Sequence, residues 1–182
     1  SVPGDQTAGR TGLPSPILIR MVMGRCRSTG EAADLLRRHI FDGRGCNWIV
    51  GDAAGAAMLV ELVPGRPPVL TPMPAGKTWL ACTNFRITGT LPNSHDTPRA
   101  IADLNSAYAR YGRIVHQLGE RIMPHSLAAL QHLLIDTAQP GMCQPEGNPL
   151  RTAYSHVCEL GTRTMHVTDG HPAEAAYKAV VL

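Results

Sequence analysis

The residues best suited to chemistry stand at the end of one apolar run. Trp79-Leu80-Ala81-Cys82 is followed by the small polar pair Thr83-Asn84 and then by Phe85. An asparagine N–H about 3 Å from a carbonyl under attack can stabilise the oxyanion of amide hydrolysis, which lowers the barrier by roughly 3 kcal/mol. An asparagine at the end of a strand can equally cap a turn. The residues alone leave both interpretations of Asn84 open.

The cysteines offer a second kind of chemistry. Five of them stand at wide, uneven spacings: Cys26, Cys46, Cys82, Cys143 and Cys158. Without a Cys-x-x-Cys pair, a zinc site built from thiolates is disfavoured, and free thiols in a reducing, cytoplasmic compartment are the expectation. Cys82 could act as a nucleophile beside a histidine, and Cys143 is a weaker candidate. A thiol in an apolar strand is, however, more often inert.

The sequence gives little support for a bound metal, a cofactor, a nucleic-acid partner or a membrane span. His125 and His132 are seven residues apart on a helical stretch, and His166 and His171 follow, but no His-Glu-x-x-His or His-x-His spacing occurs. We predict no metal, and no cofactor, since glycine-rich nucleotide motifs are missing. The net charge of +3 comes from scattered arginines with only two lysines, which argues against a nucleic-acid partner. No apolar stretch reaches the roughly 18 residues of a membrane span.

Two helices are expected before the first strands. Ser15 can cap a helix in which Pro16 takes the first position. Ser28 and Glu31 form a capping-box pattern, which predicts a second helix over Glu31 to Ile40.

Strands and further helices then follow in groups. Turn-forming and apolar residues predict four strands, at Cys46 to Val50, Ala57 to Val63, Val69 to Met73 and Trp79 to Thr83. Helical spacing predicts helices from Thr97 to Leu118 and from Leu127 to Leu134, the latter capped by Ser126. A last set of strands is expected at Thr152 to Glu159, Thr164 to Thr168 and Tyr177 to Leu182. Clustered helices and hairpins favour an α+β fold in a single domain over residues 1–182.

Four pieces of the chain, in order, resemble one family. They are Gly12-Leu13-Pro14-Ser15 followed by Ile19-Arg20, the hairpin from Asp52 to Glu61, Thr83-Asn84, and the strand pair from Ser155 to Pro172. The sequence is similar to the acyl-coenzyme A:isopenicillin N acyltransferases, which are N-terminal-nucleophile (Ntn) hydrolases with a cysteine nucleophile. The resemblance implies a four-layer αββα sandwich and autoproteolytic processing.

The resemblance also implies roles for individual residues. Asn84 matches the asparagine that helps to build the oxyanion hole, and Arg151 matches an active-site arginine that orients a carboxylate or amide. Thr83 and Phe85 would contact substrate. Phe85 replaces the usual histidine of a Thr-Asn-His signature. For Arg151, a surface position in a loop is an equally good interpretation.

The nucleophile itself is not evident. In the family it is a cysteine that becomes an N-terminus, where its own α-amino group acts as the base. Ser1 begins this chain, but Ser1 to Gln6 does not resemble a buried strand. We therefore expect this chain to be the C-terminal part of a longer precursor, whose upstream segment carries the cysteine and makes a heterodimer.

The predicted function is amide-bond hydrolysis or N-acyl transfer on a small acyl-amide or peptide-like substrate. A bile-acid-type or acyl-ethanolamine amidase of the same superfamily is a related option. The alternative is a non-catalytic protein of this fold that binds an acyl or peptidyl ligand or pairs with a subunit.

Overall fold

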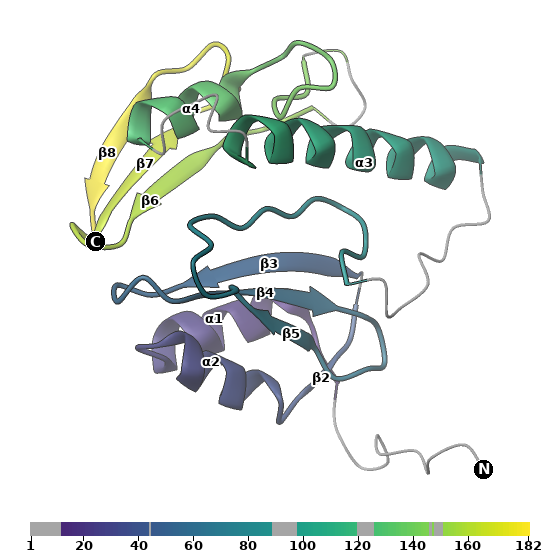
Figure 1. Cartoon of the computed structure of the whole chain (residues 1–182), viewed down its shortest axis with the longest axis vertical. Helices are drawn as coiled ribbons and strands as arrows, with labels where there is room; N and C mark the ends of the chain where they lie inside the picture. Colours follow the sequence, from purple (N-terminus) through teal and green to yellow (C-terminus); the bar gives the residue numbers. More distant parts are fainter. Residues whose placement is uncertain (1–11, 44, 89–97, 120–125, 146, 148–150) are drawn as a thin grey trace. The chain divides into compact units, whose positions relative to one another are not determined.

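The computed structural model describes residues 12–43, 45–88, 98–119, 126–145, 147 and 151–182. The chain divides into two compact units, Ser1–Ser94 and His95–Leu182, each taken by itself below (Figure 1). Each unit combines helices with a three-stranded antiparallel sheet. This mixture of helix and sheet agrees with the predicted α+β class. That the two units make one domain stays a prediction.

The first helix of the first unit begins one residue earlier than expected. Helix α1 spans Ser15–Arg25 and has Pro14 at its N-cap, with no side-chain hydrogen bond there. The prediction of Ser15 as the cap was wrong, because the chain is already helical at Ser15. The Ser15 hydroxyl instead accepts a hydrogen bond from the Cys46 thiol, at 3.7 Å.

The second helix has the predicted cap, but it begins two residues before the expected Glu31 and ends earlier than expected. In α2, Thr29–Leu36, the Ser28 hydroxyl accepts from the Glu31 backbone N–H at 3.2 Å, which confirms the cap. The predicted helix to Ile40 was too long. Ile40–Phe41 forms the short strand β2, which pairs in parallel with β1, Gly12–Leu13, so these residues bond to a strand instead of extending the helix.

Three strands form the sheet of the first unit, in the order β3-β4-β5. They are β3 (Cys46–Gly51), β4 (Ala57–Leu62) and β5 (Val69–Pro72), close to three of the predicted strands. The β3–β4 turn is stabilised by Asp52, whose carboxylate accepts from the N–H groups of Ala54 and Ala56. It also accepts from Thr29 N–H at 2.9 Å, and this bond lowers the pKa of Asp52.

The two faces of this sheet have different partners. Met58, Val60 and Leu62 of β4 pack with α1 and α2 in the buried core, together with Leu18, Val22, Ala32, Ala33, Leu35, Leu36 and Phe41. Because strand side chains alternate between faces, Glu61 and its register partner Asn47 point to the opposite face. The segment after β5 returns along that opposite face (Figure 1).

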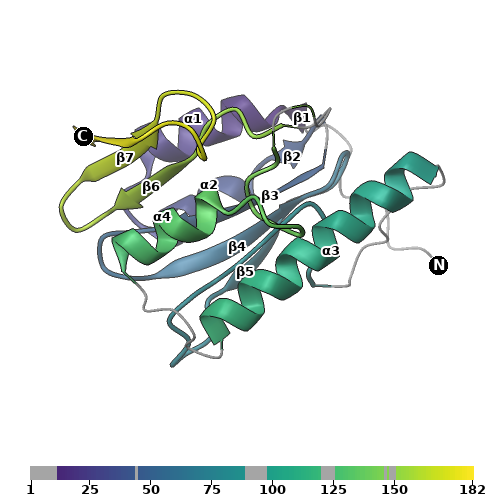
Figure 2. The same ribbon diagram turned by 90° about the horizontal axis from the view of Figure 1, so that it is seen from above.

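The second unit contains α3 (Pro98–Gly119), α4 (Leu127–Ile135) and the strands β6 (His156–Glu159), β7 (Thr164–Thr168) and β8 (Tyr177–Val181). The strands are antiparallel in the order β6-β7-β8, and α4 packs against β6 (Figure 2). Ser126 caps α4 as predicted. The expected start of α3 at Thr97 lies outside the described residues.

Strand β6 begins at His156, four residues after the predicted start of this strand at Thr152. The reason is that Thr152 is paired elsewhere: its N–H donates to the Gln144 carbonyl at 3.2 Å, and its hydroxyl accepts from Gln144 N–H at 2.9 Å. These bonds hold Thr152 to an upstream loop.

Candidate functional site

The segment that carries Asn84 has no regular secondary structure. Residues 79–83 form no strand, so the prediction of a strand from Trp79 to Thr83 was wrong. The reason is a side chain of β3: Asn47 Nδ2 donates to the carbonyl oxygens of Thr83, at 2.6 Å, and Phe85, at 2.7 Å. These two carbonyls thus bond to an amide side chain of the sheet rather than to a neighbouring strand.

The two N–H groups of Asn47 hold the backbone on both sides of Asn84. One side-chain amide has two donor hydrogens, which matches the two carbonyls it contacts. Arg86 in turn orients that amide: its Nη1 donates to Asn47 Oδ1 at 3.3 Å and its Nη2 to the Leu62 carbonyl at 2.7 Å. The position of residue 84 is therefore fixed by contacts with both β3 and β4.

Glu61 of β4 binds the backbone of the residues that follow Arg86. Its side chain is fully buried, and its carboxylate accepts from the backbone N–H groups of Ile87, at 2.7 Å, and Thr88, at 3.3 Å. A buried carboxylate needs such donors to offset its loss of water. Register partners Asn47 and Glu61 together hold the segment from Thr83 to Thr88 by its backbone.

The predicted site residues of this segment differ in exposure. Asn84 is exposed, Thr83 is half-buried, and Phe85 is only 8% exposed. The structure brings these three together beside Asn47. The sequence patterns did not identify Asn47 and Glu61 as the residues that hold this segment. The one available signal was two polar residues in otherwise apolar strands.

Cys82 is poorly suited to act as a nucleophile. Burial raises its pKa to about 11, and the Glu61 carboxylate adds to this effect. At neutral pH the group is then almost entirely the thiol, whereas nucleophilic attack needs the thiolate. The structure therefore favours the inert interpretation of Cys82.

Arg151 belongs to the second unit and is exposed. Its neighbour Thr152 is bonded to Gln144, whose carbonyl also lies 2.9 Å from His171 Nε2. His171 Nε2 is 3.5 Å from the sulfur of Cys143, which is fully buried, and burial raises the pKa of Cys143. These contacts form a polar cluster next to Arg151 in the sequence, in which Cys143 is fully buried.

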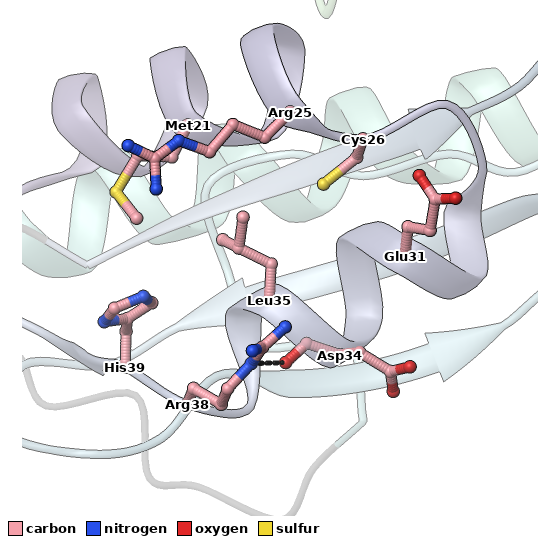
Figure 3. A pocket seen from close by; sticks show the side chains of 8 residues that line it. All are labelled: Met21, Arg25, Cys26, Glu31, Asp34, Leu35, Arg38 and His39. Atoms are coloured by element: carbon pink, nitrogen blue, oxygen red, sulfur yellow. Dashed lines mark hydrogen bonds between the residues drawn. The ribbon is translucent and has the colours of Figure 1, made fainter.

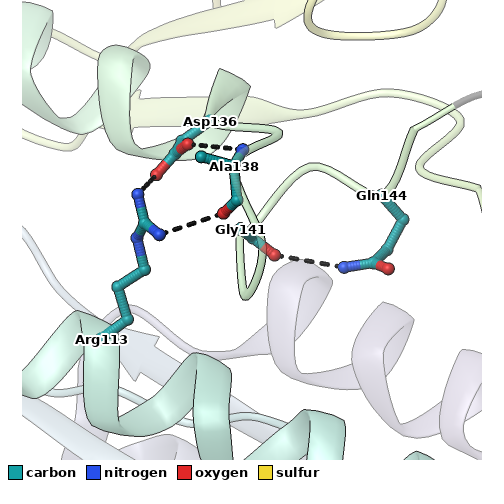
Figure 4. A network of polar contacts seen from close by, with 5 residues as sticks. All are labelled: Arg113, Asp136, Ala138, Gly141 and Gln144. Atoms are coloured by element: carbon teal, nitrogen blue, oxygen red, sulfur yellow. Dashed lines mark hydrogen bonds and ion pairs between the residues drawn. The ribbon is translucent and has the colours of Figure 1, made fainter.

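The loop that leads to Gln144 is itself attached to α3. Arg113 pairs with the Asp136 carboxylate and donates to the Ala138 carbonyl at 3.0 Å, and Gln144 Nε2 donates to the Gly141 carbonyl at 3.1 Å (Figure 4). Gly141 leaves no room for a side chain, since a Cβ there would lie 2.2 Å from the Asp136 carbonyl oxygen. Contacts therefore run from α3 to the residue next to Arg151.

A separate pocket of about 470 Å³ lies between α1 and α2 (Figure 3). Its lining is mixed in charge and comprises Met21, Arg25, Cys26, Glu31, Asp34, Leu35, Arg38 and His39. Because α1 and α2 cover the face of the sheet opposite Asn47 and Glu61, this pocket is distinct from the segment of Asn84. None of the predicted site residues lines it.

Neither a metal cluster nor a spanning helix occurs in the described part of the chain. No three His, Cys, Asp or Glu side chains among those residues are grouped to hold a metal ion. His125, one of the histidines considered above, lies outside that part, as does Ser1. No described helix combines the length and the apolar character needed to cross a bilayer.

Comparison with known proteins agrees with the resemblance seen in the sequence motifs. No curated protein and no solved structure matches the chain. The family model of the acyl-coenzyme A:6-aminopenicillanic acid acyl-transferases matches residues 5–155, which is more than half of the chain and includes Asn47, Glu61 and Asn84. The match also includes Arg151 and indicates acyl-transfer or hydrolase chemistry. The chain therefore belongs to the acyl-coenzyme A:6-aminopenicillanic acid acyl-transferase family.

Proposed function

We propose that this chain is part of an amide-bond hydrolase or N-acyltransferase of the Ntn type, in which Asn84 helps to form the oxyanion hole. The proposal rests on the exposure of Asn84 together with the hydrogen bonds that hold its backbone. Asn84 is an exposed residue, and the carbonyls on both sides of it are held by Asn47. An oxyanion hole needs a donor at an accessible position, on a backbone that does not have to reorganise.

The proposed reaction passes through a thioester. The α-amino group of an N-terminal cysteine takes the thiol proton, and the sulfur attacks the amide carbonyl carbon to form a C–S bond. The C–N bond breaks, and the leaving amine takes up the proton. Water or an amine then attacks the thioester, the C–S bond breaks, and the thiol is restored. In both steps Asn84 would donate to the carbonyl oxygen while it carries negative charge.

The cysteine is proposed to come from an upstream segment of the same precursor, released by autoproteolysis and retained as a partner chain. Within the described residues, Cys82 and Cys143 are poor substitutes because burial raises the pKa of each thiol. An N-terminal amine has a pKa near 8, which suits proton transfer at neutral pH.

The other predicted roles belong to the same proposal. Arg151 would orient a catalytic carboxylate or amide through its guanidinium fork, and Thr83 and Phe85 would contact substrate. The αββα sandwich is also proposed. It is supported by the family match and by the make-up of the two units, each of which pairs helices with an antiparallel sheet. A cytoplasmic location is proposed from the five free cysteines.

The test is to purify the protein from its complete coding sequence and to identify each polypeptide in it by intact mass and N-terminal sequencing. The proposal expects a second polypeptide that begins with cysteine. Replacing that cysteine with alanine should abolish turnover of a panel of N-acyl aminocoumarins with short, long and aromatic acyl groups. Asn84→Ala should lower kcat by about 10²- to 10³-fold. An active protein that lacks any N-terminal cysteine would overturn the mechanism. Ligand binding without turnover would favour the non-catalytic alternative.

A further inference from the structure

The hydrogen bonds of Asn47 restrict the position of the Asn84 backbone. Its Nδ2 contacts the carbonyls of residues 83 and 85 at 2.6 and 2.7 Å, so the residue between them is held on both sides by one side chain. The same contacts replace the strand pairing that residues 79–83 lack.

The position of the Asn47 amide is itself restricted. Asn47 lies within β3, in register with Glu61 of β4, so its Cα belongs to a paired ladder. Its Oδ1 accepts from Arg86, which also bonds to the Leu62 carbonyl of β4. The Oδ1 contact also fixes the orientation of the amide, since a reversed amide would present its oxygen to two carbonyls. The oxygen therefore faces Arg86 and both N–H groups face the segment of Asn84.

Catalysis by an oxyanion donor is sensitive to such support. A donor stabilises the transition state best when it is already in place, and a displacement of about 1 Å can cost on the order of 10²-fold in rate. Because residues 79–83 form no strand, side-chain bonds such as those from Asn47 restrain the backbone of this segment. The requirement for a fixed donor is therefore met here through Asn47.

We propose that Asn47 is a positioning residue for Asn84, which sets the oxyanion hole by binding the carbonyls of Thr83 and Phe85. This inference rests on the proposed function, because it assigns to Asn47 the placement of the donor that the reaction requires. Asn47 does not touch the reacting atoms in this account. Its effect should therefore pass entirely through Asn84.

The experiment is a double-mutant cycle in the enzyme purified from its complete coding sequence, with the aminocoumarin panel as probe. Asn47→Ala should lower kcat by about 10- to 100-fold with KM changed less than about threefold. In the Asn84→Ala background the same substitution should have almost no further effect on kcat, because the group it positions is gone. Independent losses that multiply would overturn the inference.

Two further variants separate positioning from folding. Asn47→Gln keeps both N–H donors but moves them by one methylene, so it should fold and still lower kcat. Ile49→Ala changes the same strand and face two residues away, without a side-chain hydrogen bond to the segment, and should retain wild-type kcat. Hydrogen exchange of the peptide over residues 79–88 should quicken in Asn47→Ala but not in Ile49→Ala. Unchanged exchange and unchanged kcat in both Asn47 variants would refute the role.

Failure of this inference is distinguishable from failure of the proposed function. If Asn84→Ala retains wild-type kcat, then Asn84 is not the oxyanion donor and the proposed function fails. If Asn84→Ala is impaired while both Asn47 variants turn over normally, only the positioning role of Asn47 fails.

Discussion

Removing the buried carboxylate of Glu61 should destabilise the first unit measurably. Glu61 is fully buried and accepts from the N–H groups of Ile87 and Thr88. In Glu61→Ala both N–H groups lose this acceptor, and a donor that loses its acceptor away from water costs about 1–3 kcal/mol, which gives at most about 2–6 kcal/mol together. Relief of the carboxylate's own desolvation offsets part of this cost. We therefore expect a loss of about 2–4 kcal/mol in the free energy of unfolding.

Glu61→Gln should be intermediate. Its single carbonyl oxygen can still accept from Ile87, at the shorter of the two distances, but its NH₂ would face the Thr88 N–H as a second donor. One lost hydrogen bond predicts a cost of about 1–3 kcal/mol. The order wild type, Gln, Ala in decreasing stability is specific to a carboxylate that accepts from two backbone groups.

Urea unfolding followed by tryptophan fluorescence is the assay. Both tryptophans, Trp48 and Trp79, lie in the first unit, so the signal reports on that unit alone. The control is Asp34→Ala, which removes an exposed carboxylate paired with Arg37 and should change stability by less than about 0.5 kcal/mol. A Glu61→Ala protein as stable as the Asp34→Ala control would refute the role of Glu61.

Three further predictions concern other parts of the chain. Alkylation of Cys82 by iodoacetamide, measured by peptide mass spectrometry, should rise about tenfold per pH unit up to about pH 10, because burial raises its pKa to about 11; a plateau below pH 9 would contradict this. Gly141→Ala should lower the thermal midpoint, since the new Cβ would meet the Asp136 carbonyl at 2.2 Å, whereas Gly161→Ala, with open space around it, should not; equal midpoints would count against the loop geometry. Ser28→Ala should cost about 1 kcal/mol in tryptophan-monitored unfolding through loss of the α2 cap, and no change would mean that the cap is not formed in solution.

Features set by local chemistry were predictable from the sequence. The caps at Ser28 and Ser126 depend on a hydroxyl three residues before the N–H it binds, and both form. The β3–β4 hairpin depends on Asp52 and Gly55 within one turn, and it also forms. Each of these interactions is contained within a few residues, so the sequence displays it directly.

Features set by distant partners were not predictable. Trp79 to Thr83 has the composition of a strand. The Thr83 carbonyl, however, accepts a hydrogen bond from the side chain of Asn47, which lies 36 residues earlier. Likewise Ile40 has the spacing of a helical residue but pairs with Gly12. Asn47 and Glu61 read as polar positions of half-exposed strands, and their importance emerges only once the segment of Asn84 lies over them. The catalytic role of Asn84 stays a prediction, whereas the residues that hold its backbone could not be chosen from sequence.

The most direct test of the central claim is to identify the atom that carries the acyl group during turnover. Enzyme from the complete coding sequence would be quenched in acid with an N-acyl aminocoumarin and digested for peptide mass spectrometry. We expect an acyl mass on a peptide that begins with cysteine, and less of it when Asn84→Ala slows acylation. An acyl group on Cys82, or turnover in which no acyl-enzyme forms, would contradict the account.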